Sequence, residues 1–170
     1  ILSDPWMWRS HASGYGSESI YDGGYWSNSE RRWGGYMGRR TSWYWQCGTS
    51  EHLDPASPYY SWAVLTDESL GVASRDRRLL GTWIEMKIRL PDGTFSERQL
   101  LPVTDGGPYG VWWNWDIQEP VLKRLGWGAV APSRYDDRAG PYYGRRDVLV
   151  RYRPDLPRVC PRKGYAAPEG

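Results

Sequence analysis

Hydrophobic and polar positions alternate with a period of two through the middle of the chain. Over residues 84–90 every second residue is apolar and the residues between them are charged, a pattern typical of a strand with one buried face. The turn sequence at 91–93 then predicts a short hairpin loop. We expect a second strand over 95–104, which leads to Asp105, and a last strand over 148–152.

One segment has the signals of a helix rather than of a strand. Glu119 and Pro120 suit a first helical turn, because a carboxylate is favourable at the positive end of a helix and proline is tolerated there. Gly126 is a natural C-terminal stop. Many short strands with one or two short helices predict a mainly β protein and, in particular, a small β-barrel.

The chain divides into three parts by composition. Residues 1–45 are rich in Gly, Ser, Tyr, Trp and Arg and show no regular period, so we expect an irregular arm that lies on the domain or on a neighbouring subunit. The aromatic residues of this arm argue against plain disorder. We expect residues 46–153 to form the folded domain and residues 154–170 to form a Pro/Gly-rich tail.

Charge and hydropathy exclude several classes of function. The 22 basic and 20 acidic residues nearly balance, so no nucleic-acid partner is expected. The chain has no apolar run of about 18 residues, so no transmembrane helix is expected. His11 and His52 lie far apart and no Cys-x-x-Cys spacing accompanies them, so we expect neither a metal site nor another cofactor.

Two residue types leave alternatives open. Cys47 and Cys160 either form a disulfide, which would close a long loop and fit an oxidising compartment, or are two buried free thiols. The chain has 12 Trp and 13 Tyr residues against a single Phe. Such rings, apolar on the face and polar at the tip, suit stacking on sugars, and they equally suit a core or a partner interface.

The densest candidate for chemistry is a strand that delivers Asp105 into a glycine-rich turn at 106–108. A carboxylate at the mouth of such a turn can meet a polymeric substrate, or it can accept hydrogen bonds from the N–H groups of its own turn. Asp116 follows eleven residues later. It is either a second acid of the site or a residue that caps the following helix.

Five short motifs around these residues occur in a fixed order. They lie at residues 70–74, 80–82, 103–109, 115–117 and 125–126. Their series resembles the rare-lipoprotein-A-like (RlpA-like) family, which is related in fold to expansins and to the catalytic domain of membrane-bound lytic transglycosylase A. The resemblance covers residues 46–152, and Cys47-Gly48 looks like the family's "ACG" element. It implies a six-stranded double-psi β-barrel.

The same resemblance implies that the ligand is peptidoglycan or another cell-wall polysaccharide, outside the cytoplasm. Active members are lytic transglycosylases, which cut the glycan between its two amino sugars and close an anhydro ring without water. That chemistry needs a carboxylic acid to protonate the leaving oxygen. Asp105 matches the family's catalytic-region Asp, and Glu51 beside His52 is the nearest candidate for its upstream Glu. The family's usual Arg and His are replaced by Gly106 and Ser74.

Aromatic residues next to the turn complete the candidate site. Trp112, Trp113 and Trp115 would form a stacking platform for sugars, although core or interface roles are equally open. Tyr109 and His52 are further substrate-binding candidates. Two further functions therefore stand beside the enzyme. The barrel could bind glycans without cutting them, as expansin-like domains do. Alternatively, the chain could be a structural component of a phage tail, a virion or a cell-surface layer, with the aromatic arm wrapping a protein neighbour.

Overall fold

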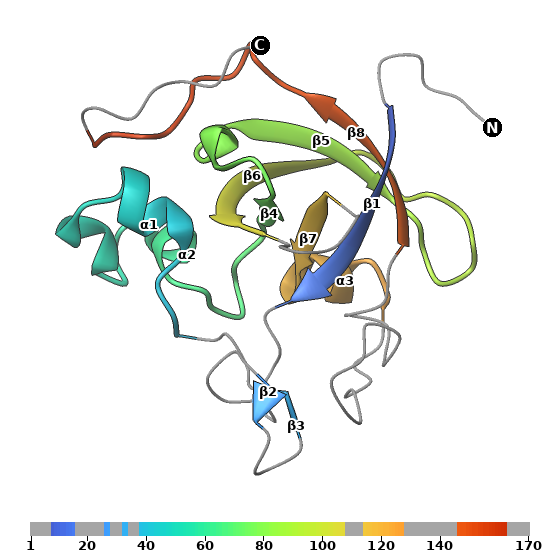
Figure 1. Cartoon of the computed structure of the whole chain (residues 1–170), viewed down its shortest axis with the longest axis horizontal. Helices are drawn as coiled ribbons and strands as arrows, with labels where there is room; N and C mark the ends of the chain where they lie inside the picture. Colours follow the sequence, from blue (N-terminus) through green and yellow to red (C-terminus); the bar gives the residue numbers. More distant parts are fainter. Residues whose placement is uncertain are drawn as a thin grey trace.

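Six strands close into a barrel in the computed structural model of the chain (Figure 1). The structure describes residues 8–15, 26–27, 32–33, 38–107, 114–127 and 146–162. The barrel strands are β1 (Trp8–Tyr15), β4 (Val72–Ser74), β5 (Trp83–Ile88), β6 (Gln99–Gly106), β7 (Trp115–Gln118) and β8 (Arg146–Tyr152). The predicted fold class, a mainly β protein built on a small six-stranded barrel, is confirmed.

The strand order around the barrel is β1-β7-β4-β6-β5-β8, and β8 returns to β1. Two neighbouring pairs are parallel, β1 with β7 and β4 with β6, and the other pairs are antiparallel. The first three barrel strands in the chain are β1, β4 and β5, and the last three are β6, β7 and β8. If β1 is exchanged with β6, β4 with β7 and β5 with β8, the order around the barrel and the parallel and antiparallel pairings stay the same. In strand order and direction the barrel therefore repeats one three-stranded arrangement, which is consistent with the double-psi connectivity that the resemblance implies.

Alternating apolar residues fill the interior of the barrel. On β5 the side chains of Ile84, Met86 and Ile88 are fully buried, and on β8 so are those of Val148 and Val150. These segments form strands because every second side chain of a strand lies on the same face, and that face is buried in the shared core. The predictions of strands near residues 84–90, 95–104 and 148–152 are confirmed by β5, β6 and β8.

The predicted helix is α3 (Glu119–Arg124), with Pro120 in its first turn. It ends at Arg124, Leu125 is its C-cap residue, and Gly126 follows with φ +88°. Glycine adopts this left-handed conformation without steric cost, so the stop has the predicted physical basis. No helix in the described part of the chain is long and apolar enough to cross a membrane.

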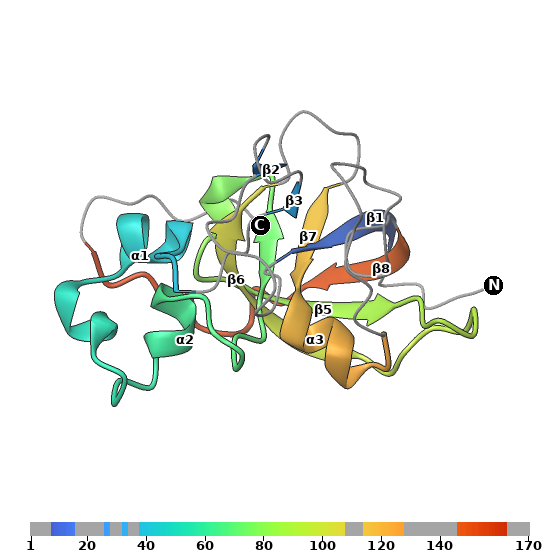
Figure 2. The ribbon, with the colours of Figure 1, turned by 90° about the horizontal axis from the view of Figure 1, so that it is seen from below.

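A helical cap lies beside the barrel, as Figures 1 and 2 both show. It consists of α1 (Ser42–Cys47), the 3₁₀ turn η1 (Ser50–Leu53) and α2 (Tyr60–Ala63). A further 3₁₀ turn, η2 (Arg77–Leu79), precedes β5, and β2 (Trp26–Ser27) pairs with β3 (Arg32–Trp33). The Cys47–Cys160 disulfide joins the end of α1 to the C-terminal segment, so of the two alternatives the bonded one is correct.

The boundary expected at residue 46 is wrong for the start of the barrel. β1 lies inside the range expected to be an irregular arm, and it closes the barrel between β7 and β8. Its sequence hides this role because its small and polar residues show no apolar alternation. Ala12 is its small residue in the main core, while Ser13 and Tyr15 enter a buried polar network.

The C-terminal segment is held against the barrel at Gly81. The N–H of Val159 donates to the Gly81 carbonyl at 2.8 Å. Gly81 has φ +85°, and a Cβ built there would lie 2.2 Å from the Val159 carbonyl oxygen. Glycine is therefore required on two grounds, backbone conformation and close approach, and the Leu80-Gly81-Thr82 motif has a structural explanation.

Candidate functional site

Four residues form one row across the strands of the barrel. In register, Ser13 on β1 faces Asp116 on β7, Asp116 faces Ala73 on β4, and Ala73 faces Asp105 on β6. Neighbouring residues on the same strands, such as Val72, belong to the main core, whereas Ala73 belongs to a separate small cluster. Because successive residues of a strand point to opposite faces, Ser13, Asp116 and Ala73 lie on the outer face of the barrel. At Asp105 the pairing of β4 with β6 shifts register, as in a β-bulge.

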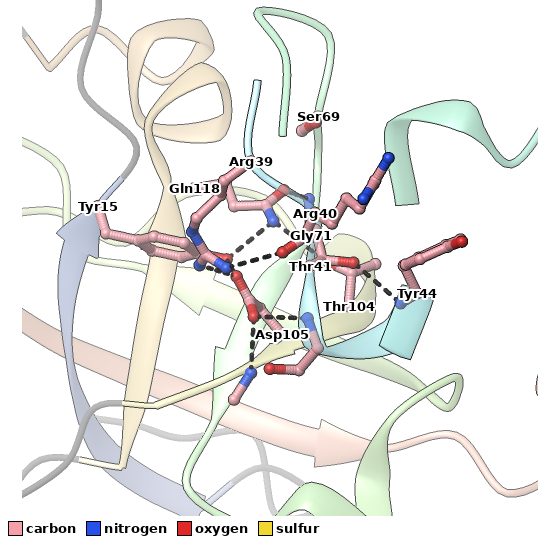
Figure 3. Close-up of polar contacts among 12 residues, drawn as sticks. Tyr15, Arg39, Arg40, Thr41, Tyr44, Ser69, Gly71, Thr104, Asp105 and Gln118 are labelled. Atoms are coloured by element: carbon pink, nitrogen blue, oxygen red, sulfur yellow. Dashed lines mark hydrogen bonds and ion pairs between the residues drawn. The ribbon is translucent and has the colours of Figure 1, made fainter. Parts of the chain in front are cut away.

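Asp105 is sealed within this row. Its carboxylate is only 1% exposed, and the surrounding donors are drawn in Figure 3. The Ser42 N–H donates to Oδ1 at 3.0 Å, as does the Gly106 N–H at 3.1 Å, while the Tyr15 hydroxyl donates to Oδ2 at 3.2 Å. The Arg39 guanidinium forms an ion pair with Oδ2. Asp105 therefore anchors the segment that leads into α1.

Gln118 organises the groups behind Asp105. Its amide nitrogen donates to the Tyr15 hydroxyl at 2.8 Å and to the Thr104 hydroxyl at 3.0 Å, and its amide oxygen accepts from the Gly71 N–H at 2.7 Å. A Cβ on Gly71 would lie 2.6 Å from the Thr104 hydroxyl, so glycine is needed there. Burial and the charge of Asp105 raise the pKa of Tyr15 well above its usual range, which keeps this phenol a neutral donor.

Asp116 lies on β7, which β4 separates from β6 in the barrel, and its environment differs from that of Asp105. Its side chain is half-buried, and its carboxylate accepts a hydrogen bond from the Ser13 hydroxyl. Burial and the nearby charge of Asp105 raise the pKa of Asp116 to about 7, against the opposing effects of Ser13 and Arg146. Protonated and ionised forms of Asp116 are therefore both populated near neutral pH.

The expectation that Asp116 caps the helix is wrong. Asp116 lies within β7, and the residue at the N-cap position of α3 is Gln118. The register with Ser13 and Ala73 turns the Asp116 carboxylate to the outer face of the barrel instead. The position of Asp116 just before a predicted helix could not reveal this orientation, because the strand that precedes the helix is short.

Arg146 is a cation whose charge acts on Asp116. It begins β8, is only 5% exposed, and its guanidinium lies 4.6 Å from the centre of the Trp127 ring. Burial lowers the pKa of Arg146 to about 10, partly offset by the charge of Asp116. The group therefore stays positive at neutral pH and lowers the pKa of Asp116.

Glu51 and His52 lie in the helical cap. The side chain of Glu51 is 83% exposed. His52 is buried, its Nδ1 accepts from the Thr49 N–H at 2.9 Å, and its ring lies 5.2 Å from that of Trp43. These contacts belong to the capping and packing of η1, and no interaction among them joins either residue to Asp105.

The remaining predicted positions are distributed as follows. Tyr109, Trp112 and Trp113 lie outside the described residues. Trp115 is buried in the main core, so the stacking role expected for it is wrong and the core alternative is correct. Ser74 is buried, and its hydroxyl accepts from the Asp76 N–H at 3.0 Å. In the described part of the chain, no group of three or more His, Cys, Asp or Glu side chains could hold a metal ion.

Besides Gln118 and Arg146, sequence reasoning missed three residues of the site that precede α1, namely Ser13, Tyr15 and Arg39. Ser13 and Tyr15 lie on β1, and Arg39 precedes α1 by a few residues. None of them belongs to a motif, and all come from the segment expected to be an arm. The one available signal was the pair of basic residues at Arg39-Arg40, which could not be assigned a partner.

Fold and site together define a class: a small closed β-barrel that holds two unlike carboxylates in one row across its strands. A scan of family models and searches of curated proteins and of solved structures found no match to this chain. The function therefore has to be inferred from the residues and their geometry.

Proposed function

We propose that the protein cuts cell-wall polysaccharide, specifically peptidoglycan, as a lytic transglycosylase in which Asp116 is the catalytic acid. The observation that carries the proposal is the half-buried Asp116, with a pKa of about 7, on the outer face of the barrel. The substrate class rests on the ordered motifs of the RlpA-like resemblance. Three of those motifs occupy β4, β6 and β7, the strands that bear Ala73, Asp105 and Asp116.

A single carboxyl group can serve both halves of this reaction. Protonated Asp116 gives its proton to the glycosidic oxygen as the bond from that oxygen to the sugar C1 breaks. The sugar's own hydroxyl then attacks C1 to close the anhydro ring, and its proton passes to the Asp116 carboxylate. A pKa near the working pH suits a group that first donates and then accepts a proton. No water is consumed, and the acid ends as it began.

Asp105 acts on this chemistry through its charge rather than by contact with the glycan. Its carboxylate is closed off by donors, so it cannot reach a leaving oxygen. Its negative charge raises the pKa of Asp116 and so maintains the protonated form. The buried Arg146 supplies positive charge that opposes this effect. The two aspartates thus divide the roles of positioning residue and acid, as paired carboxylates in unlike environments do.

The proposed location is outside the cytoplasm. The Cys47–Cys160 disulfide supports it, because such bonds form and persist in oxidising compartments. A cell-wall substrate requires the same location.

Digestion of purified peptidoglycan tests the proposal. The wild type should release anhydro-sugar products, identified by mass spectrometry, and Asp116→Asn should release at least a hundredfold less. Glu51→Gln is the matched control, because it removes an exposed carboxylate of the helical cap. Failure of the wild type to release anhydro products, while a known hydrolase digests the same preparation, would overturn the proposal. Retained binding in that case would favour a glycan-binding relative that has lost the enzyme.

A further inference from the structure

An exposed aromatic side chain lies close to the segment that Asp105 anchors. Trp45 on α1 is 58% exposed, and Leu100 on β6, at 47%, is the other large hydrophobic side chain that stands out in the described residues. Trp45 follows Ser42 by three residues on the same short helix, and the Ser42 N–H donates to Asp105. A large flat ring is therefore held near the site without being used by the core.

Two arginines lie beside Trp45. The Arg40 guanidinium lies 5.7 Å from the ring centre of Tyr44 and 5.8 Å from that of Trp45. Arg162 donates a hydrogen bond to the Trp45 carbonyl. Figure 3 shows Arg39 directed toward Asp105 and Arg40 directed away from it, toward Tyr44. Adjacent arginines thus have different surroundings, one in the buried network and one on the exposed aromatic surface.

We propose that Trp45 and Arg40 form a secondary binding subsite for an acidic glycan strand, an inference that rests on the proposed function. One sugar ring stacks on the indole of Trp45, and a carboxylate on the strand or its peptide stem pairs with Arg40. The indole offers an apolar face of the kind that sugars stack on, and more than half of its surface is open to solvent. The arginines complement a negatively charged polymer, which neither a neutral sugar nor an apolar peptide would exploit.

The spacing suits a polymer rather than a single sugar. Asp116 and Asp105 are separated by Ala73, which places them two strand spacings of about 4.8 Å apart. Ser42 contacts Asp105, and Trp45 lies less than one helical turn of about 5.4 Å further on. A strand of several sugar units spans both positions. The subsite therefore selects long chains and adds to their binding without taking part in bond cleavage.

Sedimentation of the full chain with insoluble peptidoglycan measures this binding. Trp45→Ala should weaken it roughly tenfold, and Arg40→Gln should weaken it while reducing its dependence on salt. Leu100→Ala is the matched control, since it removes an exposed apolar side chain on a barrel strand, and it should bind as the wild type does. Unchanged unfolding temperatures would show that each variant is folded.

The outcomes separate the subsite from the proposed function. If the wild type cuts peptidoglycan and Trp45→Ala binds it equally well, the subsite is refuted and the enzyme stands. If binding depends on Trp45 and Arg40 but no anhydro product forms, the subsite stands and the enzyme is refuted. If a neutral chitin oligosaccharide of equal length binds as tightly as the acidic strand, the role of Arg40 is refuted. Absence of any binding by the wild type would overturn both.

Discussion

The end of β6 and the start of β7 hold the same functional group in opposite environments. Asp105 is enclosed by four donors from Tyr15, Arg39, Ser42 and Gly106. Asp116 has the Ser13 hydroxyl as a partner, is open to solvent on part of its surface, and has a pKa raised to about 7. One residue of β4 separates them in the sheet. Environment rather than residue type therefore decides which carboxyl group can deliver a proton.

The largest effect is expected from removing the acid itself. Asp116→Asn should slow glycan cleavage about 10²- to 10⁴-fold, because an amide cannot protonate the leaving oxygen. The raised pKa of Asp116 means that the folded state disfavours its ionised form. The contribution of Asp116 to the free energy of unfolding therefore falls as the pH rises from about 4 to about 7. At pH 8 the variant should unfold at an equal or higher denaturant concentration than the wild type. If the Asp116→Asn variant were active and the Asp105→Asn variant were folded but inactive, Asp105 would be the acid and Asp116 would not.

The next effect concerns the cap that supplies donors to Asp105. Replacing both Cys47 and Cys160 by alanine opens a loop with a sequence separation of 113 residues. The chain-entropy model predicts a loss of about 4–5 kcal/mol in the free energy of unfolding. Urea unfolding of the double variant and of the reduced wild type should agree with each other. A loss below about 1 kcal/mol would show that the cap is held without the disulfide.

Asp105→Asn tests the anchor more directly. It removes the ion pair with Arg39, whose side chain is 34% exposed, and weakens the hydrogen bonds to the carboxylate, so the cost should be about 2 kcal/mol. It also removes a charge that raises the pKa of Asp116. The activity of a general acid falls as the acid ionises, so the alkaline limb of the pH–rate profile should move to lower pH. Asp92→Asn, in an exposed turn, should leave the limb in place. Movement to higher pH would contradict the assigned coupling.

Ser13→Ala should have the smallest effect and the opposite sign. The Ser13 hydroxyl donates to the Asp116 carboxylate and lowers its pKa. Its loss should therefore raise the pKa of Asp116 and move the alkaline limb to higher pH, by less than one unit. The same pH–rate measurement serves both variants. If Ser13→Ala and Asp105→Asn shift the alkaline limb of the pH–rate profile in the same direction, the Ser13 hydroxyl and the Asp105 charge do not have opposite effects on the pKa of Asp116.

Several parts of the site could be predicted from the chain alone. Asp105 and Asp116 were identified as the candidate acids, and the structure brings both to one row of the sheet. One of the two predicted roles of Asp105 was to accept a hydrogen bond from an N–H group of its own turn, and the hydrogen bond from the Gly106 N–H agrees with it. Glu51 is the nearest candidate for the upstream Glu that the resemblance implies, and His52 is a candidate because it adjoins Glu51. Neither criterion reports burial or direction. The surroundings of both residues depend on the packing of η1 against Trp43.

The sequence by itself determined the elements whose causes are local. Alternating residues define β5 and β8, and Pro120 with Gly126 marks the ends of α3, because strand period and helix ends depend on neighbours within a few positions. Only the tertiary structure decided that β1 completes the barrel and which carboxylate is sealed. The groups that form hydrogen bonds or the ion pair with Asp105 and Asp116 lie 63 to 103 residues away along the chain, apart from Gly106. Burial and charge at such separations arise only when the barrel closes, so no local pattern can encode them.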